Sequence, residues 1–531
     1  MFRTYYSTNM PWRAERVVLL LVLVFCSIQL LLVWDGGVNG VFNSPDENTN
    51  YHFAVRVFEG APFKAPSLGD GSPASDFLFT RSTRLIARSL VPTSFIGFTL
   101  FTGLLSKALF ANIIPMVTIF FSGAGLYAFF VLLRRIFDRQ IACLATFLLA
   151  IHPAWWYYTN ASLFPNILFV SLLLICFAAL LNDRCTSGIR DSAALVCLTM
   201  SLLVRTSEVL WVLPALMIFI WLNKNAVRWQ SLAWSAAPSV VILILFFGFA
   251  RELIGTTTGF GYVIGAGETS PLTLFTRYLL PFGFHPKLIL HSVWNFAVLL
   301  FAPFTILALV GFYAVIRKKN AAANAFLIIW LAISIVLFIF YGSWDVRDTV
   351  SALEVTIGTS FVRYFLPYYV LSAPVMAFGI RFIAERFRAR SYAGPASVVI
   401  LALLVYGSVV FGIYSNESVL AKLHAVRRYD TTATWVKENT EPDSIVVTRY
   451  GDKYVWPSRA VITALDHPKV LDSIGYFVRE SGRSVYLLSV TLDDASLALF
   501  QSRLQPVSVA LADPIFASAD VSIYPIIKIS P

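Results

Sequence analysis

Charged residues are scarce in this sequence of 531 amino acids. Asp, Glu, Lys and Arg make up 13% of the chain, about half of the roughly 25% that is usual in soluble domains. Hydrophobic residues make up 57%, and they gather in repeated stretches of about 20 residues, the length that an α-helix needs to cross a bilayer. These features exclude an ordinary soluble protein and predict a polytopic membrane protein.

The net charge of +11 would suggest a nucleic-acid partner if the protein were soluble. Here, however, Lys and Arg gather in short loops between the apolar stretches, as they do on the cytoplasmic side of membrane proteins. The basic charge therefore indicates topology, and we predict no nucleic-acid partner.

Cysteine and histidine are rare, with five and six residues. The cysteines all fall in predicted spans or inner loops, so we expect no structural disulfide; they are Cys26, Cys143, Cys176, Cys185 and Cys197. A metal site needs three or more converging ligands, and only Asp46, Glu47 and His52 are close in sequence. We predict no cofactor, with a divalent metal ion as the alternative.

The first apolar run, Val17–Trp34, follows Arg13 and Arg16 and has no small-residue cleavage site before Asp35. It is therefore predicted to be an uncleaved first span with a cytoplasmic N-terminus. Further single spans are predicted at Asn112–Leu133, Ile141–Trp156, Leu163–Leu181, Leu232–Ala250, Asn295–Ile316, Ala323–Tyr341, Tyr364–Ile383 and Pro395–Tyr414.

Two stretches need the loop charges to interpret them. As one helix, Ala193–Leu222 would be about 45 Å long, more than the roughly 30 Å thickness of the hydrocarbon core. Arg205 and Glu208 also lie in its middle. We therefore predict two spans that turn near Thr206. Thr93–Phe110 is predicted to be a surface helix. With both choices every basic loop lies inside, which gives about eleven transmembrane helices and an outer C-terminus.

The chain changes character near Asn416, where charge rises and long apolar runs stop. Short β-type runs alternate there with helical patterns, which predicts a small α/β domain of roughly 110 residues on the outer face. The strands are expected at Ser444–Thr448, Ala460–Thr463, Ser484–Val490, Val507–Leu511 and Val521–Ile529, and the helices at Tyr429–Asn439, Pro468–Ser481 and Thr491–Leu504. We therefore divide the chain into a transmembrane module, 1–415, and an extracytoplasmic domain, 416–531.

The first outer loop, 35–92, carries two sequence features of interest. Arg81, Arg84 and Arg88 are spaced for one face of a short juxtamembrane helix over Thr80–Leu90, which would contact membrane lipids or a phosphate. In FNSPDENTNYHFAVRVFE, a helix that begins near Asp46 would gather Glu47, His52 and Arg56 on one side. This is a candidate catalytic cluster; alternatively, the two acids only stabilise the helix N-terminus.

These residues and several other motifs resemble the GT-C superfamily of membrane glycosyltransferases, which includes aminoarabinose transferases and protein O-mannosyltransferases. The motifs are SPDENTNYHF, LLRRIFDRQ, HPAWWYYTNASLFPN, LLVRTSEVLWVLP and FVRYFLPYYV. The resemblance implies the inverting transfer of a sugar from a polyprenyl-phosphate donor, on the outer face, with Asp46 as catalytic base and Glu47 next to it. The acceptor is expected to be a lipid, a glycan or a protein. The second acidic motif of the protein mannosyltransferases is lacking, which argues against a protein.

The leaving lipid phosphate needs cationic groups, and arginine binds phosphate through two hydrogen bonds. Arg363, next to Tyr364 at the outer end of a span, is the first candidate, although an interfacial anchor explains it equally well. Further candidates for substrate binding are His52, Arg56, Arg84, Arg88 and Arg347.

Two other groups are interpreted as structural. Arg205 is expected to pair with Glu208 within the membrane, and Arg449, Asp452, Lys453, Tyr454 and Arg459 are interpreted as a solvated strand end in the C-terminal domain.

Alternatives to an enzyme are a transporter or flippase for a lipid-linked or small polar substrate, and a non-catalytic assembly protein. Against transport, charge is scarce at mid-membrane depth and the polar residues gather at one surface. The expected location is the plasma (inner) membrane.

Overall fold

A computed structural model describes residues 12–35, 40–93, 95–181, 187–222, 233–254, 280–318, 320–345, 355–388, 393–490, 494–518 and 520–529. The chain divides into two compact units. The membrane unit consists of Met1–Asp35 with Pro115–Lys422, and the α/β unit consists of Gly36–Ile114 with Leu423–Pro531. The first outer loop, which the sequence-based division kept with the membrane helices, thus shares a compact unit with the C-terminal chain.

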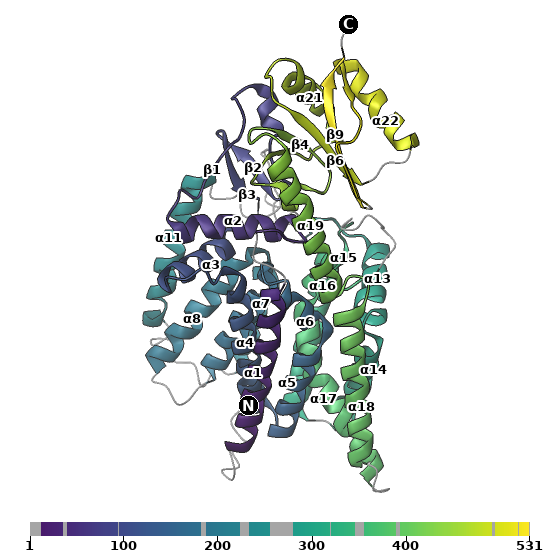
Figure 1. The fold of residues 1–531 in the computed structure, drawn as a ribbon. Coiled ribbons are helices and arrows are strands. Elements are labelled where there is room, and N and C mark those ends of the chain that lie inside the picture. Colours follow the sequence, from purple (N-terminus) through teal and green to yellow (C-terminus); the bar gives the residue numbers. More distant parts are fainter. Residues whose placement is uncertain are drawn as a thin grey trace. The chain divides into compact units, whose positions relative to one another are not determined.

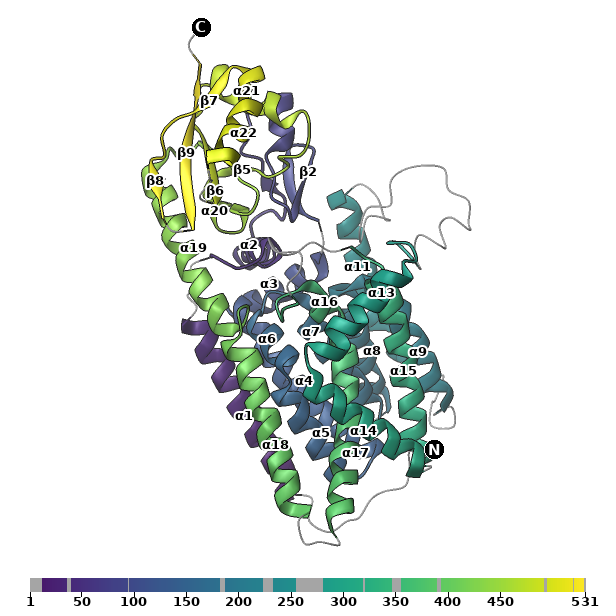
Figure 2. The same cartoon turned by 90° about the vertical axis from the view of Figure 1, so that its right-hand side faces the viewer.

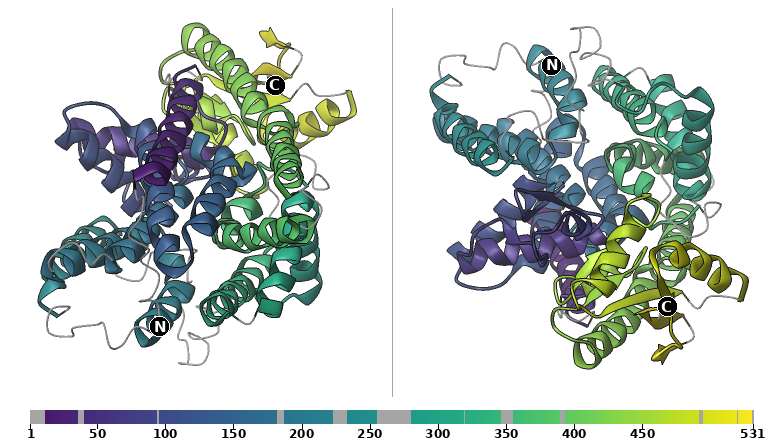
Figure 3. Two further views of the ribbon diagram at one scale, coloured as in Figure 1. Left: turned by 90° about the horizontal axis from the view of Figure 1, so that it is seen from below. Right: turned by 90° about the horizontal axis from the view of Figure 1, so that it is seen from above.

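The membrane unit is a bundle of helices, seen from their ends in Figure 3. Its longer helices are α1 Trp12–Asp35, α4 Ile114–Ile136, α5 Arg139–Ile151, α7 Pro165–Leu180, α8 Ser187–Val204, α9 Val209–Leu222, α11 Ala237–Ile254, α14 Ala302–Lys318, α15 Ala321–Gly342, α17 Leu366–Arg388 and α18 Ala393–Val409. Shorter helical segments are α6 Pro153–Asn160, η2 Thr206–Glu208, α13 Pro286–Ser292, η3 Val293–Leu299, α16 Ser360–Tyr364 and η4 Val410–Tyr414. Most predicted spans coincide with one of the longer helices. Two of them run across a bend instead: Ile141–Trp156 extends from α5 into α6, and Asn295–Ile316 extends from η3 into α14.

The described residues contain six helices that are long and apolar enough to cross a membrane, or up to nine if each of three bent pairs is one span. One bent pair joins α8 to α9 at an angle of 114°, and η2 lies at the bend. The turn predicted near Thr206 is therefore confirmed.

Glycines allow α14 and α17 to pack closely. A Cβ atom on Gly311 of α14 would lie 1.8 Å from the carbonyl oxygen of Val375, and one on Gly379 of α17 would lie 2.6 Å from that of Leu307. Small residues at a helix crossing let the two backbones approach in this way. A larger side chain at either glycine would force the helices apart.

In the first loop, α2 Pro45–Glu59 packs against α3 Ile96–Ala108, the latter within the helix predicted at Thr93–Phe110. Along the chain, α2 and α3 are separated by β1 Ala65–Pro66, η1 Pro73–Phe77, β2 Thr83–Ile86 and β3 Ser89–Pro92. The three strands form a sheet in the order β1-β3-β2 (Figure 1).

The helix predicted over Thr80–Leu90 is wrong, because this stretch forms an antiparallel hairpin. Ile86 pairs with Ser89, which leaves Ala87 and Arg88 as the two turn residues. Both have positive φ, 47° and 61°, as the tight hairpin turn requires. The arginine spacing favoured a helix, but pairing with β3 determines the structure.

The C-terminal chain contains α19 Val419–Asn439, β4 Ile445–Val447, α20 Asp452–Val455, β5 Ala460–Ile462, α21 Val470–Arg479, β6 Val485–Val490, α22 Asp494–Leu504, η5 Gln505–Val507, β7 Val509–Leu511, β8 Phe516–Ala517 and β9 Val521–Lys528. The main sheet has the order β5-β4-β6-β9-β7, with β8 on β9. Strand β4 is parallel to β5 and β6, and β9 is antiparallel to β6 and β7. The small C-terminal α/β fold predicted from the sequence is confirmed.

The first loop completes the hydrophobic core of this sheet. Ala74 and Leu78 are buried, at 7% and 2% exposure, and belong to the same cluster as Ile462 and Phe477. Leu78 also forms a bridge with Ile462 at the edge strand β5. Figure 2 shows β2 of the loop beside the sheet. The two parts of the α/β unit, far apart in sequence, therefore share one core.

Candidate functional site

Local sequence fixes the start of α2 just before the two acids. Ser44 has extended backbone and its Oγ accepts a hydrogen bond of 3.2 Å from the backbone nitrogen of Asp46. Pro45 follows as the first helical residue, a position that suits its fixed φ. Asp46 and Glu47 thus lie in the first helical turn, where negative charge is stabilised, so the sequence-based electrostatic role and a catalytic role are compatible.

Asp46 is bound by a serine of the hairpin segment. The Oγ of Ser82 donates a hydrogen bond of 2.6 Å to Oδ1 of Asp46, a distance typical of a hydroxyl bound to a carboxylate. Asp46 is half-buried and Glu47 is only 2% exposed, so neither acid points into open solvent. Sequence reasoning missed Ser82, because nothing in the sequence indicates that a residue 36 positions away lies beside Asp46.

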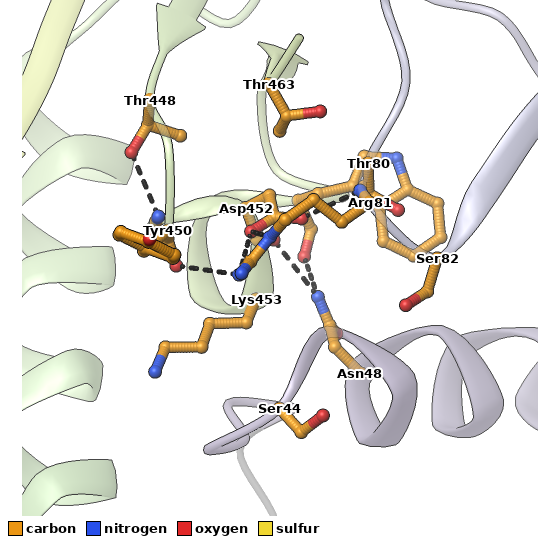
Figure 4. Close-up of polar contacts among 12 residues, drawn as sticks. Ser44, Asn48, Thr80, Arg81, Ser82, Thr448, Tyr450, Asp452, Lys453 and Thr463 are labelled. Carbon is orange, nitrogen blue, oxygen red and sulfur yellow. Dashed lines mark hydrogen bonds and ion pairs between the residues drawn. The ribbon is translucent and has the colours of Figure 1, made fainter. Parts of the chain in front are cut away.

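A buried ion pair joins the hairpin segment to α20 (Figure 4). Asp452 accepts three hydrogen bonds from Arg81: from the backbone nitrogen at 2.9 Å, from Nε at 3.0 Å and from Nη2 at 2.7 Å. The Asp452 side chain is fully buried and that of Arg81 is 32% exposed. The interpretation of Asp452 as part of a solvated strand end is therefore wrong.

Helix α2 is also bound to the C-terminal chain. Nδ2 of Asn48 donates to the carbonyl oxygens of Asp452, at 3.3 Å, and Trp456, at 2.9 Å. Asn48 is 1% exposed, so these bonds replace water that the amide has lost. The α20 segment therefore binds Arg81, which precedes Ser82. It also binds α2, the helix that carries Asp46.

His52 and Arg56 lie on α2 beyond the acids. The His52 ring packs edge-on against Trp456, with centroids 5.4 Å apart, and burial lowers its pKa to about 4, so the ring is neutral near pH 7. Arg56 donates from Nε to Pro62 at 2.8 Å and from Nη2 to Lys64 at 3.1 Å, in both cases to the carbonyl oxygen. Arg56 thus orders the loop that follows α2.

The other two arginines of the first loop differ in their surroundings. Arg88 is exposed at the hairpin turn and donates to the carbonyl oxygen of Gly71 at 3.4 Å. Arg84 lies on β2, and its Nε and Nη2 atoms are buried and have no hydrogen-bond partner within the described part of the chain. Burial lowers the pKa of Arg84. Of the two, Arg84 is the one with buried donors available to an anion.

In the membrane unit, Arg363 and Tyr364 lie together on α16. Arg363 is 9% exposed, its Nη2 donates to Oγ of Ser360 at 2.8 Å, and its Cζ lies 4.3 Å from the ring centroid of Phe164. The carbonyl oxygen of Arg363 accepts a hydrogen bond of 2.8 Å from Asn166. Arg363 is therefore firmly positioned. Arg347 lies outside the described residues.

Tyr364 adjoins a buried polar cluster. Its ring stacks on Tyr341, with centroids 4.5 Å apart, and the Tyr341 hydroxyl donates to Oε1 of Glu208 at 2.5 Å. Nη2 of Arg205 lies 2.7 Å from the same oxygen, which confirms the predicted pairing of Arg205 with Glu208. The cluster joins the bend between α8 and α9 to α15 and α16.

No group of three or more His, Cys, Asp or Glu side chains is placed to hold a metal ion among the residues that the structure describes. The absence of a cofactor, with a divalent metal ion as the alternative, stays a prediction from the sequence.

No protein-family model matches the sequence, and no curated protein matches it. Solved structures do match. One is ArnT from Cupriavidus metallidurans, crystallised with bound undecaprenyl phosphate; the TM-score is 0.52 and the identity 12%, over 95% of this chain and 97% of ArnT. Another is the mycobacterial arabinofuranosyltransferase AftD, with a TM-score of 0.51 and 13% identity over 95% of this chain and 40% of AftD. Both neighbours are GT-C glycosyltransferases, and this chain has the GT-C fold that its motifs predicted.

Proposed function

We propose that the protein is a membrane glycosyltransferase that transfers a sugar, a hexose or a pentose, from a polyprenyl-phosphate donor to an acceptor hydroxyl. The observation that carries the proposal is the carboxylate of Asp46, fixed at the start of a capped helix by the hydroxyl of Ser82. The GT-C fold supports it. ArnT, with the same fold, binds undecaprenyl phosphate.

In this mechanism Asp46 acts as general base. It accepts the proton of the acceptor hydroxyl while that oxygen attacks the anomeric carbon of the sugar. The bond between the anomeric carbon and the phosphate oxygen breaks with its electrons moving to the phosphate, so a single displacement inverts the anomeric centre. The products are the glycosylated acceptor and the polyprenyl phosphate. Glu47, the neighbouring acid, is the second candidate catalytic residue.

The leaving phosphate gains negative charge during transfer. A guanidinium group that is already positioned stabilises this charge without reorganising. We assign that role to Arg363, because its side chain is buried and fixed by Ser360 and Phe164. Tyr364 borders the donor. His52, Arg84, Arg88 and Arg347 remain candidate substrate-binding residues, while the bonds of Arg56 to its own loop favour a structural role.

We place the reaction on the extracytoplasmic face of the plasma (inner) membrane, with the N-terminus in the cytoplasm, because this orientation keeps the basic loops inside. The acceptor is a lipid, a glycan or a protein in contact with that face. Membrane lipids surround the helices.

Mass spectrometry of cells that lack the protein tests this proposal. Lipid-linked sugars and envelope glycans are compared among deletion cells that carry the wild type, Asp46→Asn or no copy. The proposal predicts that one sugar modification disappears in the deletion, returns with the wild type and stays absent with Asp46→Asn. Identical glycans in all three strains would contradict it.

One observation favours a transporter instead. The Arg205–Glu208 pair lies at the break between two apolar helices, and charged groups at broken helices are typical of transport pathways. A transporter would move its lipid-linked or small polar substrate across vesicles that contain no acceptor. A glycosyltransferase would do so no faster than protein-free vesicles.

A further inference from the structure

The hydrogen bond between Ser82 and Asp46 restricts the carboxylate that we assign as base. Ser82 is 6% exposed, so its hydroxyl exchanges little with water. A donor 2.6 Å from Oδ1 opposes rotation of the carboxylate.

The backbone around Ser82 is held on both sides. The backbone nitrogen and the hydroxyl of Thr93 each donate to the carbonyl oxygen of Ser82, both at 3.0 Å. On the other side, Arg81 is bound to Asp452 through its backbone nitrogen and its guanidinium. Ser82 therefore has little freedom to move away from α2.

Helix α2 is fixed to the same short segment. Asn48, two residues after Asp46, donates to the carbonyl oxygens of Asp452 and Trp456. The residue next to Ser82 and the turn that carries Asp46 are thus both bound to α20 and the residue that follows it. Figure 4 shows this arrangement, with Asp452 between Arg81 and Asn48.

We propose that Ser82 is a positioning residue for the base Asp46, and that Asp452 of the C-terminal chain sets the separation of the two. The proposal rests on the proposed function, since it concerns the residue assigned there as base. The C-terminal chain would then contribute to the transfer reaction by holding residues of the first loop in place.

Steady-state kinetics of the purified full chain test this inference. Ser82→Ala is expected to lower kcat about 10- to 100-fold, the effect of losing a hydrogen bond to a charged group, while KM for the donor changes less than about twofold. Ser82→Thr, which keeps the hydroxyl, should restore most of kcat, and Ser89→Ala on β3 is the matched control.

A double-mutant cycle tests the role of α20. Asp452→Asn should lower kcat, and adding Ser82→Ala to it should lower kcat by much less than Ser82→Ala does alone. Should Asp452→Asn not fold, Arg81→Lys replaces it in the cycle.

The outcomes separate this inference from the proposed function. If Asp46→Asn is inactive but Ser82→Ala keeps wild-type kcat, only the positioning role fails. A lowered kcat that Ser82→Thr does not restore, or full additivity in the cycle, would also overturn it. If Asp46→Asn still turns over, the assignment of the base fails and this inference fails with it.

Discussion

The ion pair between Arg81 and Asp452 allows a quantitative prediction for the α/β unit. Arg81→Met removes the two guanidinium hydrogen bonds to a carboxylate that is fully buried, and only the bond from the backbone nitrogen remains. Leaving a buried charge without its partner typically costs about 3–5 kcal/mol, and we expect about 4 kcal/mol here. Asp452→Asn should cost less, because the amide oxygen still accepts and Arg81 is 32% exposed to water.

Hydrogen exchange of the full chain in detergent measures this loss locally. About 4 kcal/mol corresponds to nearly 10³-fold lower protection of amides that exchange through opening of the unit, here in β2, β3 and β4. The matched control is Arg449→Met, which breaks a pair of the same 2.7 Å distance to Asp466, with side chains 53% and 83% exposed. That surface pair should contribute less than about 1 kcal/mol. Equal losses in the two variants would refute the reasoning.

Three further predictions concern other parts of the molecule. Gly311→Ala should destabilise the membrane unit by about 1–3 kcal/mol, because the new Cβ would lie 1.8 Å from the carbonyl oxygen of Val375; an unchanged thermal midpoint would contradict the close packing. Burial lowers the pKa of His52 from 6.5 to about 4. The free energy of unfolding should therefore fall by about 3 kcal/mol between pH 6.5 and pH 4, because only the unfolded chain binds a proton at His52 in that range, and the stability is fully present above pH 6.5. His52→Gln should remove this pH dependence from denaturant unfolding curves, with His467→Gln at an exposed histidine as the control. Arg363→Met should weaken binding of the polyprenyl-phosphate donor about tenfold or more, and an unchanged donor affinity would count against its assignment.

Local features of the fold could be read from the sequence. The start of α2 follows from Ser44 and Pro45, which are common at the cap and first position of helices. The spans follow from apolar length, and the turn near Thr206 follows from the charges of Arg205 and Glu208 within an overlong apolar stretch. In each case the determining residues are close to one another in the chain.

Contacts between distant residues could not be read in this way. The spacing of Arg84 and Arg88 fits a helix, but β2 pairs with β3 and the segment becomes a hairpin. Asp452 lies 371 positions from Arg81, so its burial against the first loop has no local signal. For the same reason Ser82 was missed, although Asp46 itself was predicted as the base.

The most direct test of the proposed activity compares wild type with Asp46→Asn in purified form, using a polyprenyl-phosphate sugar identified from the deletion strain. Two quantities are measured together, namely donor binding and release of polyprenyl phosphate in the presence of acceptor. We predict that Asp46→Asn is folded and binds the donor with wild-type affinity but releases no polyprenyl phosphate above background. Turnover by Asp46→Asn close to that of the wild type would contradict the assignment of Asp46 as the catalytic base.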